Sequence, residues 1–173
     1  MSDFLPAVVQ AFQSLLDKGF LKVETSVYDR EAFGNGAVVL SGRNLRIRMI
    51  RDRGQVFAEA ASCSLARDWF PLQMVLRAVG VTFPMPEGLL TSDEAAKLVE
   101  QCFSELDNGL SNHRVTQTRA KLAEMERVST REASNPDDAR SDWLTAFEAT
   151  FRRLGVSSAD RCNTCSAPRF AGV

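Results

Sequence analysis

The fold is decided by the stretch Leu45-Arg46-Ile47-Arg48-Met49-Ile50, Arg51-Asp52-Arg53-Gly54, Gln55-Val56-Phe57-Ala58-Glu59-Ala60. Its first arm alternates apolar and charged residues, which is the period-two pattern of a half-buried strand. The second arm is also rich in apolar residues. The four-residue link between them ends in Gly54, and a link of this length commonly needs a residue with positive φ before the return strand. We therefore predict a β-hairpin whose apolar residues face the core and whose arginines face solvent or a partner.

The residues before the hairpin continue the β pattern. Phe20 to Tyr28 is predicted to be extended, and Ala37-Val38-Val39-Leu40 is predicted to be a short strand. Gly34-Asn35-Gly36 is a turn signal between them. Four strands in a row with short links favour an antiparallel meander.

Helical patterns flank these strands. A stripe from Phe4 to Leu16 recurs at helical spacing after a cap at Ser2 or Asp3, and Gly19 marks its end. After the sheet, Asp68-Trp69-Phe70-Pro71 is predicted to begin a helix that stops at Gly80.

The second half of the chain is predicted to be helical, with a loop before it. Thr82 to Leu90 holds two prolines and is predicted to be extended. Thr91-Ser92-Asp93-Glu94 has the spacing of a capping box and should begin a helix with an apolar side. Ser111 to Ser134 is charged and suggests an exposed, projecting helix. Asn135-Pro136-Asp137-Asp138 should begin a last helix that ends at Gly155.

Strands grouped before helices indicate an α+β protein. We expect an N-terminal helix, a four-stranded antiparallel meander, and then three to four helices packed on one face of the sheet. Residues 1–155 are predicted to form a single domain, and residues 156–173 a flexible polar tail.

Composition narrows the possible partners. The 173 residues are 45% hydrophobic and 25% charged, with a net charge of −1, so no overall charge favours nucleic acid or an anionic membrane. No apolar run approaches the length of a membrane span. The opening residues have no basic stretch before their apolar run, so a secretory signal is not expected. We predict a cytoplasmic, bacterial protein.

Charge is nevertheless uneven along the chain. Within residues 87–110 the only basic residue is Lys97, against six acidic residues: Glu87, Asp93, Glu94, Glu100, Glu105 and Asp107. Five arginines surround the hairpin: Arg43, Arg46, Arg48, Arg51 and Arg53. A solvated face explains either cluster, but an acidic helix could also bind a basic protein, and the arginines could also bind phosphate.

Residues typical of catalysis are sparse. His113 is the only histidine, and no nucleophile motif accompanies it. No glycine-rich phosphate loop is present. Cys162-Asn163-Thr164-Cys165 is a single C-x-x-C pair in the predicted tail, which leaves metal or redox binding open beside the interpretation as incidental thiols. We expect no catalytic residues, no cofactor and no metal.

The hairpin also carries a resemblance. Asn44-Leu45-Arg46-Ile47-Arg48 and Arg51-Asp52-Arg53-Gly54-Gln55-Val56-Phe57 resemble a stretch of small bacterial immunity proteins of polymorphic toxin and contact-dependent inhibition systems. The resemblance covers Phe33 to Val79. It implies a cytoplasmic protein that binds one cognate toxin domain and blocks it, and it carries over no functional residue.

Three functions follow as hypotheses. The first is an immunity protein that occludes a toxin. The second is a secretion chaperone or adaptor, similar to those of type III systems, that binds an effector segment through the helix at Ser111 to Ser134. The third is an enzyme with a dispersed site around His113. For the binding hypotheses the candidate partner-binding residues are Glu87, Asp93, Glu94, Glu100, Arg46 and Arg48.

Overall fold

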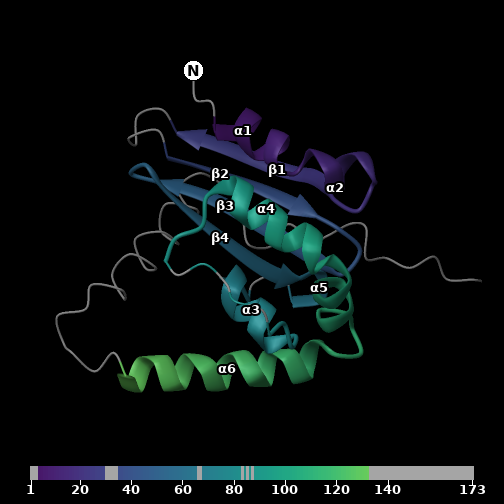
Figure 1. Ribbon diagram of the computed structural model, residues 1–173, viewed down its shortest axis with the longest axis vertical. Helices are drawn as coiled ribbons and strands as arrows, with labels where there is room; N and C mark the ends of the chain where they lie inside the picture. The colour runs from purple at the N-terminus through teal and green to yellow at the C-terminus, as the bar shows by residue number, and fades with distance from the viewer. Residues whose placement is uncertain are drawn as a thin grey trace, which may run out of the picture.

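A five-stranded antiparallel sheet forms the centre of the computed structural model, and helices cover one of its faces (Figure 1). The structure describes residues 4–29, 35–65, 68–82, 84, 86 and 88–132. The strands lie side by side in sequence order: β1 (Lys22–Asp29), β2 (Asn35–Ser41), β3 (Leu45–Asp52), β4 (Gln55–Ser62) and β5 (Phe70–Pro71). The predicted α+β class and antiparallel meander are confirmed.

The sequence did not predict β5. Its two residues pair with Glu59 and Ala60 of β4, where a helix entry was expected. The helix itself begins one residue later, because Pro71 takes an extended conformation with ψ of 133°. The short strand therefore widens the sheet before the chain turns into the helix.

The central hairpin is tighter than predicted. β3 and β4 run to Asp52 and Gln55, so the link has two residues instead of four. Both have positive φ, 48° at Arg53 and 83° at Gly54, as two-residue hairpin turns of type I′ require. Asn35 stabilises this turn: its Oδ1 accepts from the Arg53 amide at 2.9 Å, and its Nδ2 donates to Asp52 at 2.8 Å. Asn35 and Gly36 therefore belong to β2 rather than to the predicted turn.

The strand register sorts side chains onto two faces. Ile47 lies opposite Leu40 of β2 and Ala60 of β4, and all three are fully buried. Leu45 and Met49 share this face and are also fully buried. The predicted core face of the hairpin is therefore confirmed.

The helices are α1 (Phe4–Ala11), α2 (Gln13–Asp17), α3 (Leu72–Ala78), α4 (Ser92–Gln101), α5 (Phe103–Gly109) and α6 (Val115–Glu132), with a short 3-10 turn at Cys63–Leu65. Figure 1 shows α1, α3 and α4 on the same face of the sheet, with α6 running beside α3. The helices thus pack on one face, as predicted.

Two helices that were expected to be continuous are interrupted. The breaks fall at Phe12 (φ −91°, ψ 8°) and Cys102 (φ −117°, ψ 22°). Both side chains are buried, at 0% and 3% exposure, so packing in the core supports the local departure from helical geometry. The helix ends are as predicted, with Gly19 and Gly80 at φ of 69° and 100°.

Several predictions fall outside the described residues. They concern the cap at Ser2 or Asp3, the helix after Asn135 and the tail 156–173 with its C-x-x-C pair. Within the described part of the chain, no helix is long and apolar enough to cross a membrane.

Candidate functional site

Two of the hairpin arginines, Arg46 and Arg48, are paired inside the protein. Arg46 makes a bidentate contact with Glu24 of β1, from Nε to Oε2 at 2.9 Å and from Nη2 to Oε1 at 2.6 Å. Arg48 donates to Glu59, the residue directly opposite it on β4, with Nε 2.7 Å from Oε2. The exposed fractions of Arg46 and Glu59 are only 7% and 5%. The prediction that these arginines face solvent was therefore wrong.

Trp69 completes this polar layer. Its ring lies over both guanidinium groups, with the centroid 4.4 Å from Cζ of Arg48 and 5.3 Å from Cζ of Arg46. The aromatic face attracts the two cations, and each cation is already matched by a carboxylate. Arg46 and Arg48 thus stabilise the fold, and their donors are directed at Glu24 and Glu59 rather than at a phosphate.

One of the predicted acids, Glu94, stabilises the start of α4 itself. Glu94 closes the capping box: Thr91 Oγ1 accepts from the Glu94 amide at 3.2 Å, and the Glu94 carboxylate accepts from the Thr91 amide at 2.8 Å. The hydrogen bond from the Thr91 amide, followed by one from the Thr91 hydroxyl to the same carboxylate at 2.8 Å, lowers the pKa of Glu94. Asp93 is exposed on the first turn of α4, and Glu87 lies outside the described residues.

Glu100 connects α4 to the N-terminal helices. Its Oε1 accepts from Lys18 Nζ at 2.9 Å and from the Ser14 hydroxyl at 2.6 Å. The hydrogen bond from Lys18, followed by that from Ser14, lowers the pKa of Glu100. The Lys18–Glu100 pair is half-exposed, so it fixes geometry at the surface more than it adds stability.

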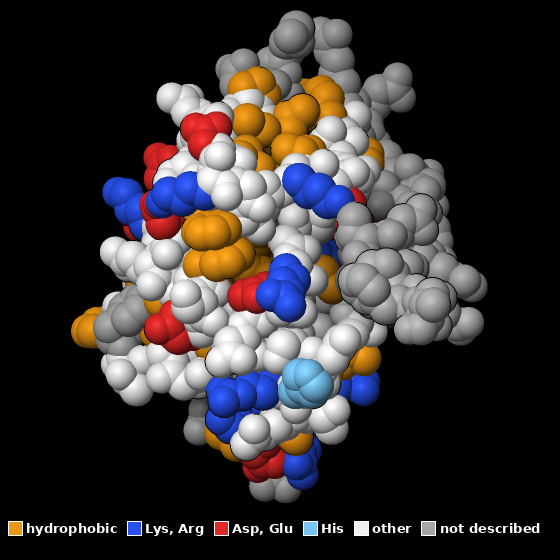
Figure 2. All heavy atoms as spheres, turned by 90° about the vertical axis from the view of Figure 1, so that its right-hand side faces the viewer, with side chains coloured by type: hydrophobic (Ala, Val, Ile, Leu, Met, Phe, Trp, Pro, Cys, Tyr) orange, Lys and Arg blue, Asp and Glu red, His pale blue; other side chains and the backbone are white. Residues whose placement is uncertain are grey.

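Phe20 and Phe103 form a stacked pair of aromatic rings. Phe20 follows α2, Phe103 begins α5, and their ring centroids are 4.8 Å apart with an interplanar angle of 14°. Phe20 is 46% exposed and Phe103 is partly buried. Figure 2 shows the face on which α2 and α5 lie, with hydrophobic side chains near its middle and charged groups of both signs around them.

The stacked pair is held on fixed elements. Asp107 of α5 accepts two hydrogen bonds from Asn44 in the β2–β3 turn, from its amide at 3.0 Å and its Nδ2 at 2.9 Å. Sequence reasoning placed Phe103 on the apolar side of its helix and missed the surface pair. The signal was weak, because Phe20 and Phe103 are far apart in sequence and each fits a core position locally.

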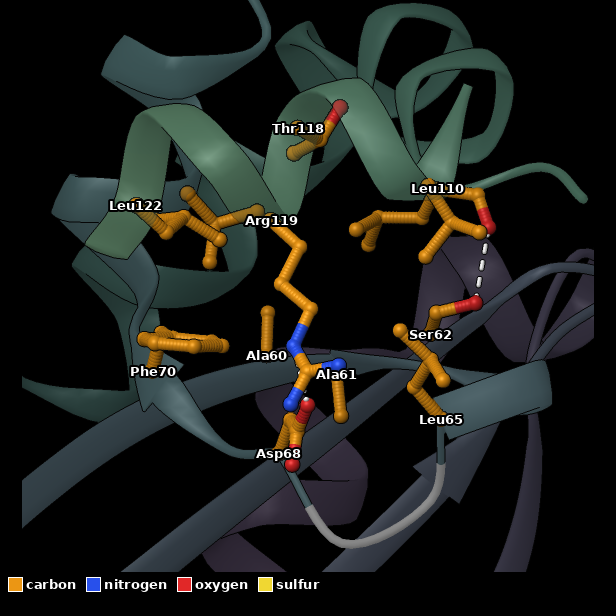
Figure 3. A pocket seen from close by; sticks show the side chains of 12 residues that line it. Ala60, Ala61, Ser62, Leu65, Asp68, Phe70, Leu110, Thr118, Arg119 and Leu122 are labelled. Atoms are coloured by element: carbon orange, nitrogen blue, oxygen red, sulfur yellow. Dashed lines mark hydrogen bonds and ion pairs between the residues drawn. The ribbon is translucent and has the colours of Figure 1, made fainter. Parts of the chain in front are cut away.

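A small apolar pocket lies between the β4 end of the sheet and α6 (Figure 3). At its mouth Arg119 Nε lies 2.8 Å from Asp68 Oδ2, and on its wall the Ser62 hydroxyl donates to the Leu110 carbonyl at 2.8 Å. The remaining lining is mostly aliphatic, and the enclosed space is close to that of one water molecule. These groups pack α6 against the sheet.

The residues considered for catalysis are separated. His113 is exposed in the turn before α6, as expected of a surface histidine. Cys63 and Cys102 are buried, and burial together with the nearby Glu105 carboxylate raises the pKa of Cys102. A raised pKa keeps the thiol protonated and weakly reactive. Among the described residues, no group of three or more His, Cys, Asp or Glu side chains could hold a metal ion.

The chain matches no protein-family model, no curated protein and no solved structure. The resemblance of the hairpin to immunity proteins therefore stays a prediction.

Proposed function

We propose that this protein is a cytoplasmic binding protein of the immunity type, which neutralises a cognate bacterial toxin by covering part of its surface. The observation that carries the proposal is the stacked pair of Phe20 and Phe103. Aromatic side chains are enriched among the residues that dominate binding energy at protein interfaces. Phe20 is 46% exposed beside the partly buried Phe103, so its ring is available for such contact without further ordering.

Charge around the pair suits a partner with basic groups. Glu105 is exposed on α5, close in sequence to Phe103, whereas Glu100 and Lys18 are matched to each other. Carboxylates at the rim of an interface steer a basic partner and select against wrong ones. A cationic side chain of the partner would also be attracted to the faces of the two rings.

The test is binding and protection with the product of the neighbouring gene. We expect the wild-type protein to bind that product in calorimetry and to protect cells that express it. Phe103→Ala should weaken binding at least about tenfold, because a central aromatic contact contributes more than 1.4 kcal/mol. Val128→Ala is the matched control, since Val128 is an exposed apolar residue on the distant α6.

Two results would contradict the proposal. One is the absence of binding and protection by the wild-type chain. The other is an equal loss of affinity in Phe103→Ala and Val128→Ala, which would place the contact elsewhere. Circular dichroism of each variant shows whether it is folded, so that a loss of affinity can be assigned to the surface.

A secretion chaperone or adaptor is the second candidate, and α6 favours it. The first half of α6 is anchored by Leu122 and by the Lys121 Nζ bond to the Ala78 carbonyl at 3.1 Å, while Val128 beyond it is 45% exposed. An effector segment could pack along the second half of α6, which holds Val128. In that case Val128→Ala would weaken binding and Phe103→Ala would not.

A further inference from the structure

β1 is a free edge of the sheet. It pairs with β2 on one side, and no described strand pairs with it on the other. An exposed edge presents unpaired backbone N–H and C=O groups and can pair with another strand. Exposed large apolar side chains gather beside it: Phe20, Val23 and Tyr28 lie at or just before β1, and Leu5 lies on the neighbouring α1.

Only the first half of β1 carries features that block pairing with another strand. The register between β1 and β2 shifts between Val23 and Thr25, which marks a β-bulge, and Lys22 is an exposed charge just before it. Bulges and lysines are the devices by which proteins block edge pairing. From Thr25 to Tyr28 the strand is regular and carries no charged residue.

We propose that residues 25–29 of β1 pair antiparallel with the same segment of a second copy of the chain, about a two-fold axis at Val27. The proposal does not rest on the proposed function. In this register Val27 faces Val27 of the other copy, and Ser26 faces Tyr28.

The faces of the strand fit this register. Ser26 and Tyr28 lie opposite Val38 and Gly36, on the helix-covered face, whereas Val27 lies opposite Ala37 on the other face. Directly opposed residues of an antiparallel pair share a face, so Ser26 meets Tyr28 and Val27 meets Val27 without a further bulge. The helix-covered faces of the two copies would then lie on the same side of one continuous sheet.

Self-pairing also suits the side chains. No like charges face each other, because Thr25, Ser26, Val27 and Tyr28 are uncharged and Asp29 faces Thr25. The two Tyr28 rings become diagonal neighbours, a separation that aromatic side chains can bridge. Each ring, 46% exposed in the single chain, thereby gains an apolar contact. Asp29, at the end of the segment, is its only charged residue.

The test is the mass of the purified full chain by sedimentation velocity from nanomolar to high micromolar concentration. We expect a monomer–dimer equilibrium. Val27→Lys places two like charges opposite each other at the axis and should raise the dimer Kd at least about tenfold. Val23→Lys, on the same edge but before the bulge, is the matched control and should leave the Kd unchanged.

A second variant tests the same pairing in case Val27→Lys does not fold. Val27→Cys should form an intermolecular disulfide on mild oxidation, because opposed Cα atoms of an antiparallel pair are about 4.5–5.5 Å apart. Val23→Cys and the wild-type chain give the background from the other cysteines. A monomer at every concentration, or a dimer that neither Val27→Lys weakens nor Val27→Cys links, would overturn the proposal. The assay uses this chain alone, so its failure leaves the toxin-binding test unaffected.

Discussion

Trp69 lies 4.4 Å from Cζ of Arg48 and covers a guanidinium that is paired with Glu59 on the neighbouring strand. The sequence predicted that Arg48 faces solvent or a partner, but its guanidinium is enclosed between the strands and an indole ring. Their position makes the pair sensitive to the loss of either member.

Removing one charge of the Arg48–Glu59 pair should strongly lower the free energy of unfolding. Glu59 is only 5% exposed, and Arg48→Met removes the partner of its buried carboxylate. Breaking a buried pair in this way destabilises a protein by about 3–5 kcal/mol. Urea denaturation followed by circular dichroism measures the loss. The double variant Arg48→Met, Glu59→Leu should recover most of it, because no unpaired charge remains. A double variant as unstable as the single one would contradict this explanation.

The capping box of α4 gives a second prediction. Thr91→Ala removes the side chain that accepts from the Glu94 amide, and loss of such a cap costs about 1 kcal/mol. Chemical denaturation should show this decrease in the free energy of unfolding. Thr116→Ala is the control, because Thr116 is an exposed threonine within α6. If both variants lose equal stability, the cap is not the cause.

Acid titration tests the contact between Lys18 and Glu100. The Lys18 ammonium lowers the pKa of Glu100, so the stability it contributes is present above the ordinary pKa of a glutamate and is lost as the pH falls through the lowered value. In Lys18→Met the pKa of Glu100 should rise toward its ordinary value, as measured by NMR of the carboxyl carbon. Lys97→Met should leave it unchanged. The stability difference between wild type and Lys18→Met should shrink as the pH falls.

Close packing between α5 and α3 predicts the effect of a single methyl group. A Cβ at Gly109 would clash first with Cγ1 of Val79, which Val79→Ala removes, and would lie 2.9 Å from the Val79 Cβ. Gly109→Ala should therefore destabilise the protein by about 1–3 kcal/mol, although alanine favours helices. Thermal unfolding measures the change. Adding Val79→Ala should relieve part of the strain, so a double variant with fully additive losses would argue against a direct clash.

The elements that sequence predicted well are those with local signals. The alternation from Leu45 to Ile50 predicted a strand and its core face, and the spacing of Thr91 and Glu94 predicted a helix start. These patterns depend on residues within a few positions of one another. The two-residue turn at Arg53 was missed because Asn35, from another strand, stabilises it.

The surface chemistry depended on distant residues and could not be predicted in the same way. Arg46 pairs with Glu24 across an intervening strand, and Phe20 stacks on Phe103 from a helix more than eighty residues later. Neither partner can be identified from the sequence around it. From the sequence Arg46 and Arg48 were therefore expected at the surface, although they are largely buried and paired, and the aromatic pair gave no signal.

The order of the strands has a consequence for how this chain folds. From β1 to β4 each strand pairs with the next one along the chain, through short connections and, at Arg53 and Gly54, through only two residues. Closing such short loops loses little chain entropy, and proteins rich in local contacts fold quickly. Residues 22–62 can therefore assemble their sheet from successive hairpins, on which the later helices then pack.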